Sequence, residues 1–87
     1  NAQFEIDVAS EMSEFLGRFE PSKDGLWLIV DNGVVHGSIF IDGESATRAR
    51  LRWFILSEAC RGHGLGRQLM EKALGFAREK GYEAVYL

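Results

Sequence analysis

The chain is poor in cysteine and proline, and it lacks any long hydrophobic run. Its 87 residues include one Cys and one Pro. The single thiol, Cys60, cannot form an internal disulfide, so a disulfide-stabilised secreted domain is not indicated. No apolar run approaches the ~20 residues that cross a bilayer, and no signal peptide is recognisable. The expectation is therefore a cytoplasmic protein without a membrane partner.

An excess of basic charge is also lacking. The formal net charge of −3 and the pI near 5.3 do not indicate nucleic-acid binding by the chain as a whole. Basic residues gather only locally, in the two groups Arg48/Arg50/Arg52 and Arg61/His63/Arg67. The apolar share of 46% is that of an ordinary globular protein. We expect one small domain, whose core is marginal without a ligand or partner.

The N-terminal segment is expected to be a helix over residues 3–19. Apolar side chains recur there at helical spacing, namely Phe4, Val8, Met12, Phe15 and Phe19. Residues 4–8 also alternate as a short strand would, but the helical pattern continues for several turns. Pro21 disfavours helix at the residue before it and is expected to set the end of the helix.

Strand patterns follow the first helix. A hairpin is expected over 26–41, because Asp31-Asn32-Gly33 provides residues that tolerate positive φ between two apolar runs. A long strand is expected over 47–57. Strict alternation along it places Leu51, Trp53 and Ile55 on one face, and Arg48, Arg50, Arg52, Phe54 and Leu56 on the other.

A second helix is expected over 64–80, with Gly81 closing it and a strand over 83–87 following it. Its apolar side is formed by Leu65, Leu69, Ala73, Phe76 and Ala77. A strand, a glycine loop, a helix and a strand form a right-handed βαβ crossover. Together with the hairpin, this crossover predicts an α/β fold with a mixed sheet.

Three glycines at every second position lie between the long strand and the second helix, in Arg61-Gly-His-Gly-Leu-Gly-Arg67. Glycine reaches positive φ and lets a ligand approach the main chain. The free N–H groups of the following helix bind anions. The spacing lacks the Lys-Ser or Lys-Thr of a Walker loop, and it differs from the Gly-x-Gly-x-x-Gly of dinucleotide-binding folds. The loop is thus expected to bind a phosphate group of another kind.

The core Arg61-x-x-Gly64-x-Gly66 resembles motif A of the GCN5-related N-acetyltransferases (GNAT), and the similarity extends from Leu26 to Leu87. The runs Leu51–Leu56, Arg61–Arg67 and Phe76–Tyr82 are especially similar to the acetyltransferase half of bacterial fusions with a MarR-type DNA-binding domain. The resemblance implies a GNAT-type mixed sheet that is incomplete at both ends, since family domains carry further strands and helices. It also implies an acetyl-CoA-dependent N-acetyltransferase that acts on a primary amine by direct attack.

In this family the loop that corresponds to residues 61–66 holds the pyrophosphate of acetyl-CoA. Main-chain groups at the end of the preceding strand contact the pantetheine and the acetyl oxygen. The resemblance therefore implies these cofactor-binding residues: Ile55, Leu56, Ser57, Arg61, Gly62, His63, Gly64, Leu65, Gly66 and Arg67. Many family members carry Pro where Glu58 stands, so this chain departs from the pattern at that position.

No catalytic residue is assigned from the sequence, and no metal site is indicated. Glu44, Glu58 and His36 are candidates for the general base, although each is also typical of a turn or surface residue. The Tyr that protonates the leaving thiolate in many family members lies beyond the matching strand, so Tyr82 and Tyr86 are interpreted as packing residues. Cys60 lacks a base at a defined spacing and is weak support for a covalent acyl step.

Two alternatives to an enzyme remain open. A non-catalytic acyl-CoA-binding regulatory module could keep the phosphate loop without acceptor chemistry. A fragment could also fold only with another chain, and we expect self-association or a partner fragment because strand 83–87 ends in an apolar edge. The acceptor, whether a small-molecule amine or a protein lysine, is not specified by the sequence.

Overall fold

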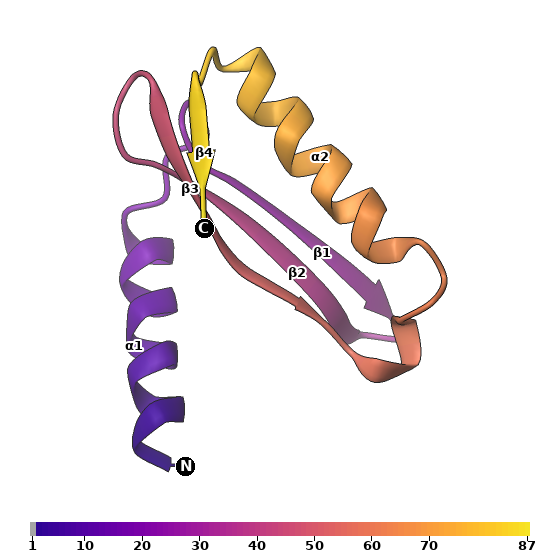
Figure 1. Cartoon of the computed structure of the whole chain (residues 1–87). Coiled ribbons are helices and arrows are strands. Elements are labelled where there is room, and N and C mark those ends of the chain that lie inside the picture. Colours follow the sequence, from indigo (N-terminus) through magenta and orange to yellow (C-terminus); the bar gives the residue numbers. More distant parts are fainter. Residues whose placement is uncertain (1) are drawn as a thin grey trace.

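A computed structural model describes residues 2–87, with side chains described from Ser10 onward. The elements run in the order α1 (Ala2–Gly17), β1 (Gly25–Asp31), β2 (Val34–Gly43), β3 (Arg48–Leu56), the short 3-10 helix η1 (Glu58–Cys60), α2 (Leu65–Glu79) and β4 (Ala84–Tyr86). The strands form one sheet in the order β1-β2-β3-β4 (Figure 1). β1, β2 and β3 are antiparallel, whereas β4 is parallel to β3. The predicted α/β class with a mixed sheet is confirmed.

The helix α2 lies along one face of this sheet, and the C-terminal part of α1 packs against the opposite face (Figure 1). On one face, Ile39, Ile41 and Leu51 are buried against Leu69 and Ala73 of α2. On the other face, α1 packs through aromatic rings described below. Side chains alternate along a strand, so β2 supplies apolar residues to both faces and forms the centre of the core. β2 is accordingly buried from Gly37 to Gly43.

The hairpin between β1 and β2 turns at Asn32 and Gly33, whose φ angles are 51° and 77°. Positive φ at both central residues defines the type I′ turn that suits the twist of antiparallel strands. The ladder runs from Gly25 opposite Ile41 to Asp31 opposite Val34, with a register shift between Ile29 and Val30.

The expectation that Leu51, Trp53 and Ile55 share one face of β3 is wrong. The register between β2 and β3 shifts between Ser38 and Phe40, and Trp53 adopts a φ of 46°. This β-bulge adds a residue to β3 and breaks the alternation. Leu51 consequently packs in the core on the α2 face, whereas Trp53 stacks on Phe15 of α1.

The helix α1 ends at Gly17, so it stops before Pro21 rather than next to it. Turn hydrogen bonds continue the chain, since Arg18 N donates to the Phe15 carbonyl at 3.2 Å. Phe15 is fully buried, and its ring meets those of Phe19, Phe40 and Trp53 edge to face. Phe4 and Val8, the first two residues of the predicted apolar stripe, lie outside the described side chains.

The helix α2 ends in a Schellman motif. Gly81 has a φ of 81°, the Tyr82 N–H donates to the Ala77 carbonyl at 3.0 Å, and the Gly81 N–H donates to the Arg78 carbonyl at 3.1 Å. These bonds satisfy carbonyls that the last turn leaves free. They also direct the chain into β4, which pairs with β3 from Arg48 to Arg50.

Candidate functional site

The end of β3 presents main-chain groups on one side only. On the β2 side, Leu56 pairs with Gly37, Ile55 pairs with Ser38, and the Ser57 N–H donates to the His36 carbonyl at 2.7 Å. The β4 ladder extends no further along β3 than Arg50. Within residues 2–87, the opposite side of β3 from Leu51 onward therefore has no strand partner. The main chain of Ile55, Leu56 and Ser57 lies in this segment.

The loop after β3 passes through two glycines in the left-handed region. Gly62 and Gly64 have φ angles of 81° and 74°, and no heavy atom beyond the two chain neighbours lies within 4 Å of the position that a Cβ would take at either residue. Gly64 is the N-cap of α2 and makes no side-chain capping bond. The first helical bond runs from Gln68 N to the Gly64 carbonyl at 3.1 Å. The amides of Leu65, Gly66 and Arg67 thus precede the helical ladder and are available to an anion.

Gly66 differs in backbone conformation from the other two glycines of the loop, Gly62 and Gly64. It lies inside α2 without a positive φ, so of the three glycines only Gly62 and Gly64 use the left-handed region. A Cβ at Gly66 would meet Leu56 Cδ2 at 3.5 Å and Phe54 Cζ at 3.7 Å, which are ordinary contacts. The backbone of Gly66 therefore lies close to the end of β3, and the helix start and the strand end form one continuous surface.

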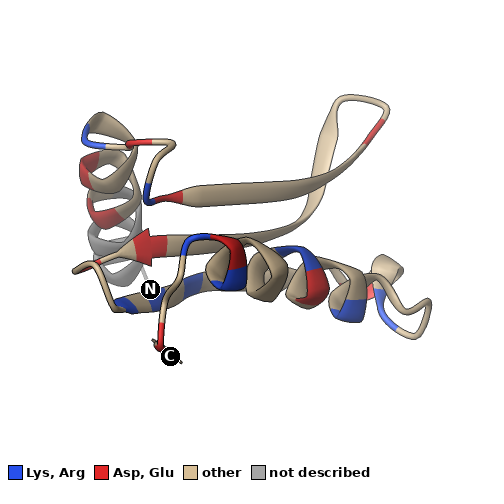
Figure 2. Cartoon of the chain, turned by 90° about the horizontal axis from the view of Figure 1, so that it is seen from above, with Lys and Arg blue, Asp and Glu red and all other residues tan. Residues whose placement is uncertain are grey.

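Positive charge surrounds this helix start. Arg61, His63 and Arg67 are exposed, and the first turn of α2 contains no acidic residue. Arg61 also donates its Nε–H to the Leu56 carbonyl at 3.4 Å, which links the loop to the strand. Figure 2 shows that the charges lie on the helices, the loops and β3, whereas the middle of β1 and β2 is uncharged. Cationic side chains and the positive end of the helix dipole both favour an anion here.

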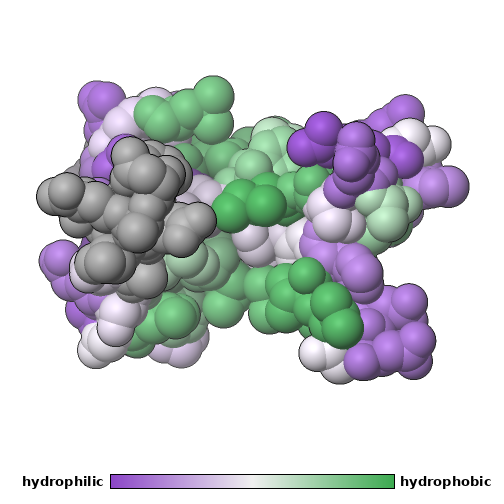
Figure 3. Space-filling view, turned by 90° about the horizontal axis from the view of Figure 1, so that it is seen from below, coloured by the Kyte–Doolittle hydropathy of each residue, from purple (hydrophilic) through white to green (hydrophobic). Residues whose placement is uncertain are grey.

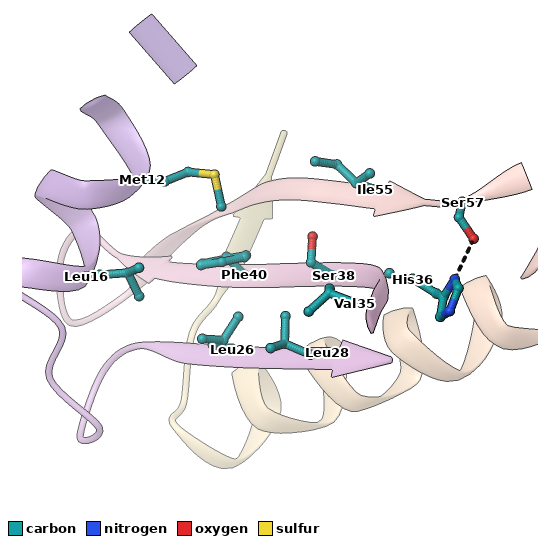
Figure 4. A pocket seen from close by; sticks show the side chains of 11 residues that line it. Met12, Leu16, Leu26, Leu28, Val35, His36, Ser38, Phe40, Ile55 and Ser57 are labelled. Atoms are coloured by element: carbon teal, nitrogen blue, oxygen red, sulfur yellow. Dashed lines mark hydrogen bonds between the residues drawn. The ribbon is translucent and has the colours of Figure 1, made fainter. Parts of the chain in front are cut away.

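A cavity of 460 Å³ opens on the α1 face of the sheet, beside the end of β3. Most of its described lining is apolar, from Met12, Leu16, Leu26, Leu28, Val35, Phe40 and Ile55. The polar lining side chains are Ser38, His36 and Ser57. His36 and Ser57 lie together at one end of the cavity, with Ser57 Oγ 3.4 Å from His36 Nδ1 (Figure 4). Ile55 and Ser57 therefore belong both to this cavity and to the predicted cofactor segment.

The three candidates for a general base lie in different places. His36 lines the cavity. Glu58 is exposed in η1, on the loop side of Ser57. Glu44 follows Gly43 at the opposite end of β2 and accepts a hydrogen bond from the Tyr86 hydroxyl. The structure thus brings His36, but not Glu44, to the end of β3.

The two tyrosines interpreted as packing residues both make hydrogen bonds away from the glycine loop. Tyr82 packs against the core on the α2 face and donates its hydroxyl to the Lys23 carbonyl at 2.7 Å. Burial raises the pKa of Tyr82, and the nearby carboxylates of Asp24 and Asp42 raise it further. Tyr86 stacks under Arg48, whose guanidinium carbon is 4.3 Å from the ring centroid.

Sequence reasoning missed two buried carboxylates. Asp24 is 1% exposed and accepts hydrogen bonds from the backbone N–H groups of Glu20 and Gly43 and from the Lys23 ammonium. It thereby fixes the loop after α1 to the end of β2. The only sequence signal is an Asp-Gly pair in a loop, which is typical of many turns.

Asp42 is the second such carboxylate, and it pairs with two arginines. Arg18 donates two bonds to it, at 3.2 and 2.9 Å, and Arg52 donates one at 3.1 Å. Burial by itself raises the pKa of Asp42, but the hydrogen bonds from Arg18 and Arg52 outweigh that effect, so the pKa lies below its ordinary value. Arg52, which strict alternation places on the same face of β3 as Arg48 and Arg50, has a side chain only 14% exposed. These groups form a structural cluster between α1 and the sheet.

Among the described side chains, no group of three or more His, Cys, Asp or Glu residues is placed to hold a metal ion. Neither helix, over the residues that the structure describes, has the length and apolar character needed to cross a membrane.

Comparison with known proteins gives a family match and similar structures. The model of the acetyltransferase (GNAT) family matches residues 2–87. An acetyltransferase from Streptococcus agalactiae 2603 is 25% identical, with a TM-score of 0.76 over 88% of this chain and 48% of that chain. A GNAT family acetyltransferase from Elizabethkingia anophelis, solved with acetyl-CoA bound, is 17% identical, with a TM-score of 0.68 over 87% of this chain and 46% of that chain.

A third similar structure is Rv2747 from Mycobacterium tuberculosis, solved in complex with CoA and NLQ. It is 22% identical, with a TM-score of 0.62 over 69% of this chain and 38% of that chain. The chain spans less than half the length of each of these three proteins. The comparison with curated proteins gave no match.

Proposed function

The chain belongs to the acetyltransferase (GNAT) family, and from this premise we propose that it forms the acetyl-CoA-binding part of an N-acetyltransferase. The observation that carries the proposal is the glycine-capped start of α2, placed directly after the end of β3. The residues present fit the cofactor. Gly62 and Gly64 place no side chain in the loop before α2, and no acidic residue repels an anion at the first turn of α2.

We assign the cofactor's pyrophosphate to the amides of residues 62–67. The N–H groups of Leu65, Gly66 and Arg67 lie ahead of the helical ladder, and each charge-assisted bond contributes ~1.5–3 kcal/mol. Arg61 and Arg67 add exposed positive charge, and His63 lies between them. Because these side chains are exposed, their contribution is screened by salt, and the main-chain bonds are expected to dominate.

We assign the pantetheine arm to the main chain of Ile55, Leu56 and Ser57. Their β4 side has no strand partner within residues 2–87, so an extended chain that carries amides can hydrogen-bond there. Such binding would hold the thioester in place along β3, which lowers the entropic cost of reaction. Bound acetyl-CoA supplies the activated acetyl group. The residues of this chain bind and orient it.

The acceptor in this proposal is a primary amine on a small molecule or a protein. An alkyl ammonium with a pKa of ~10.4 is mostly protonated at neutral pH, so a group near the site must remove a proton before attack. The structures from Elizabethkingia anophelis and Mycobacterium tuberculosis, with acetyl-CoA and CoA respectively, support this choice of cofactor by similarity.

A second candidate is a non-catalytic acyl-CoA-binding module. It would need only the glycine loop and the end of β3, whereas an enzyme also needs a group that protonates the thiolate. The hydroxyls of Tyr82 and Tyr86 bond to the Lys23 carbonyl and to Glu44, away from the glycine loop. Neither hydroxyl is placed to protonate a thiolate at that loop. Binding of CoA without acetyl transfer to any amine would favour this candidate.

The test of the proposal is a thermal-shift comparison of CoA, acetyl-CoA, ATP and NAD. CoA and acetyl-CoA at 100 times the dissociation constant should stabilise the protein by ~2.7 kcal/mol. ATP and NAD should give smaller shifts, because the loop lacks the Walker lysine and the dinucleotide spacing. A shift with ATP or NAD as large as that with CoA would contradict the proposal.

A further inference from the structure

The cavity on the α1 face has two chemically different ends. In Figure 4, Met12, Leu16 and Phe40 lie toward one end, and His36 and Ser57 lie at the other. Among the described lining residues, His36 carries the one titratable side chain. The volume of 460 Å³ is within the range of small-molecule sites, which are mostly apolar with a few polar groups. An amphipathic ligand of matching polarity fits this arrangement.

The apolar part of the cavity is exposed rather than closed by the described chain. Leu16, Leu28, Val35 and Ile55 are each about half exposed, at 49%, 46%, 56% and 54%. Seen from below, apolar side chains run across the middle of the molecule and hydrophilic ones lie toward both ends (Figure 3). Covering this surface with hydrocarbon would remove apolar area from water, which is favourable.

The polar end of the cavity adjoins residues 55–57, the segment assigned to the pantetheine arm. Ser57 and Ile55 line the cavity with their side chains, and their main chain belongs to the proposed pantetheine site. Ser57 also fixes His36, through the 2.7 Å bond from Ser57 N to the His36 carbonyl and through the contact between Ser57 Oγ and His36 Nδ1. A ligand whose polar group lies beside His36 would therefore have that group next to the proposed cofactor.

We propose that the acceptor is an apolar primary amine whose hydrocarbon part occupies this cavity, and that His36 accepts the proton of its ammonium group. This inference rests on the proposed acetyl-CoA-dependent function. The ammonium gives one proton to the neutral imidazole, and the amine nitrogen then forms a C–N bond with the acetyl carbonyl carbon. The C–S bond breaks, and CoA leaves as a thiolate. A second N–H proton neutralises the thiolate, so the products are the amide, CoA and imidazolium.

The first test compares hexylamine, ethanolamine and spermidine in steady-state acetylation and in calorimetric titration of the CoA-saturated protein. Hexylamine should bind most tightly and have the highest kcat/KM, by about tenfold or more. The matched variants are Val35→Gln and Val34→Gln. The two valines are adjacent and similarly exposed, at 56% and 53%, but Val35 lines the cavity and Val34 does not. Val35→Gln should raise the KM for hexylamine, and Val34→Gln should leave it unchanged.

The second test addresses His36. His36→Gln retains a polar side chain beside Ser57 and should lower kcat by about 100-fold with little change in KM. Added imidazole should restore part of the rate, which a merely structural role would not produce. Full activity of His36→Gln, or a loss that imidazole does not relieve, would overturn the assignment of the proton acceptor.

The outcomes separate this inference from the proposed function. If the protein binds CoA but prefers ethanolamine or spermidine, or if Val34→Gln and Val35→Gln behave alike, the cavity is a packing surface and the apolar acceptor is wrong. The acetyltransferase function would then stand. If CoA does not bind and no amine is acetylated, both the function and the inference fail.

Discussion

At the scale of single residues, the glycines of the 61–67 loop are not equivalent. Gly62 and Gly64 adopt positive φ, so a β-branched residue there strains the backbone by roughly 1–2 kcal/mol. Gly66 has helical geometry and room for a Cβ at ordinary contact distance. A substitution at Gly66 therefore tests whether a ligand approaches the main chain, without a large backbone strain. A substitution at Gly64 would both strain the backbone and block that approach.

We expect Gly66→Val to weaken CoA binding by about tenfold or more, which corresponds to the loss of one charge-assisted hydrogen bond. Arg61→Ala should weaken it less, because Arg61 is exposed and its charge is screened. Gly75→Val is the matched control, since Gly75 lies in the same helix and only Arg78 Nη2 approaches its Cβ position, at 4.0 Å. Calorimetric titration with CoA measures the dissociation constant of each folded variant. Normal CoA binding by Gly66→Val would mean that the loop is only a turn.

Asp42 is the residue whose ionisation should matter most for folding. Its pKa is below the ordinary value of 3.8, because the hydrogen bonds from Arg18 and Arg52 outweigh the effect of burial. A depressed pKa stabilises the fold above the unfolded-state value, and that stabilisation is lost as the pH falls through the folded-state pKa. The protein should thus lose stability on acidification below about pH 4.

Asp42→Asn should lower the free energy of unfolding at neutral pH by about 1–2 kcal/mol, because the mostly buried Arg52 keeps only its longer ion pair, at 3.5 Å to Glu11, and Arg18 is partly exposed. It should also flatten the dependence on pH in the acid range. Urea denaturation at several pH values measures both effects, with Asp31→Asn at the exposed hairpin end as the control. Equal stability of the two variants at neutral pH would refute the role of the cluster.

At the scale of elements, periodicity locates a strand better than it assigns its faces. The apolar run before the glycine loop indicated β3, which spans Arg48–Leu56. Strict alternation then failed at Trp53, because the bulge opposite Ser38–Phe40 adds a residue to one strand. A bulge depends on tertiary packing, here of Trp53 against Phe15 and Phe40, and a single sequence carries no signal for it.

The attachment of α1 to the sheet should depend on Phe15. Its side chain is fully buried among three aromatic rings, so Phe15→Ala should destabilise the protein by about 3–5 kcal/mol. Leu16→Ala is the neighbouring control, because Leu16 is 49% exposed, and it should cost much less. Urea denaturation gives the energies, and amide hydrogen exchange should show faster opening of α1 than of α2. Similar losses of unfolding free energy for both variants would contradict the proposed role of Phe15 in attaching α1 to the sheet.

At the scale of the whole molecule, the sequence predicted the α/β class and the family. Both depend on local sequence patterns that can be recognised without knowing the tertiary contacts. The glycine loop, the Asn-Gly turn and the helix periodicity each reflect a local backbone requirement. The clusters around Asp24 and Asp42 were missed because their partners are distant in sequence, such as Asp42 with Arg18. The assignment of residues 55–57 and 61–67 to CoA stays a prediction until binding is measured.

The edges of the sheet are expected to drive association of the chain. β1 and β4 are the edge strands of the sheet, and an uncovered edge pairs readily with another chain. Apolar side chains are exposed beside both edges, including Val30 at 55% and Leu87 at 84%. We therefore expect the 87-residue chain to associate in solution or to retain a partner fragment, and we expect negligible acetyl transfer from the unassociated chain, so that the kinetic tests of the amine site apply to the associated protein. Sedimentation equilibrium over a range of concentrations measures the mass.

Substitution at the β4 edge can locate the contact. Leu87→Lys should shift the equilibrium toward monomer, because a lysine at a sheet edge opposes pairing with a second chain. Val34→Lys, at the hairpin end of β2, is the control for added charge and should change the mass less. A stable monomer that unfolds cooperatively and acetylates an amine would show that these residues suffice as an enzyme. Equal effects of the two lysines would indicate a general response to charge rather than a contact at β4.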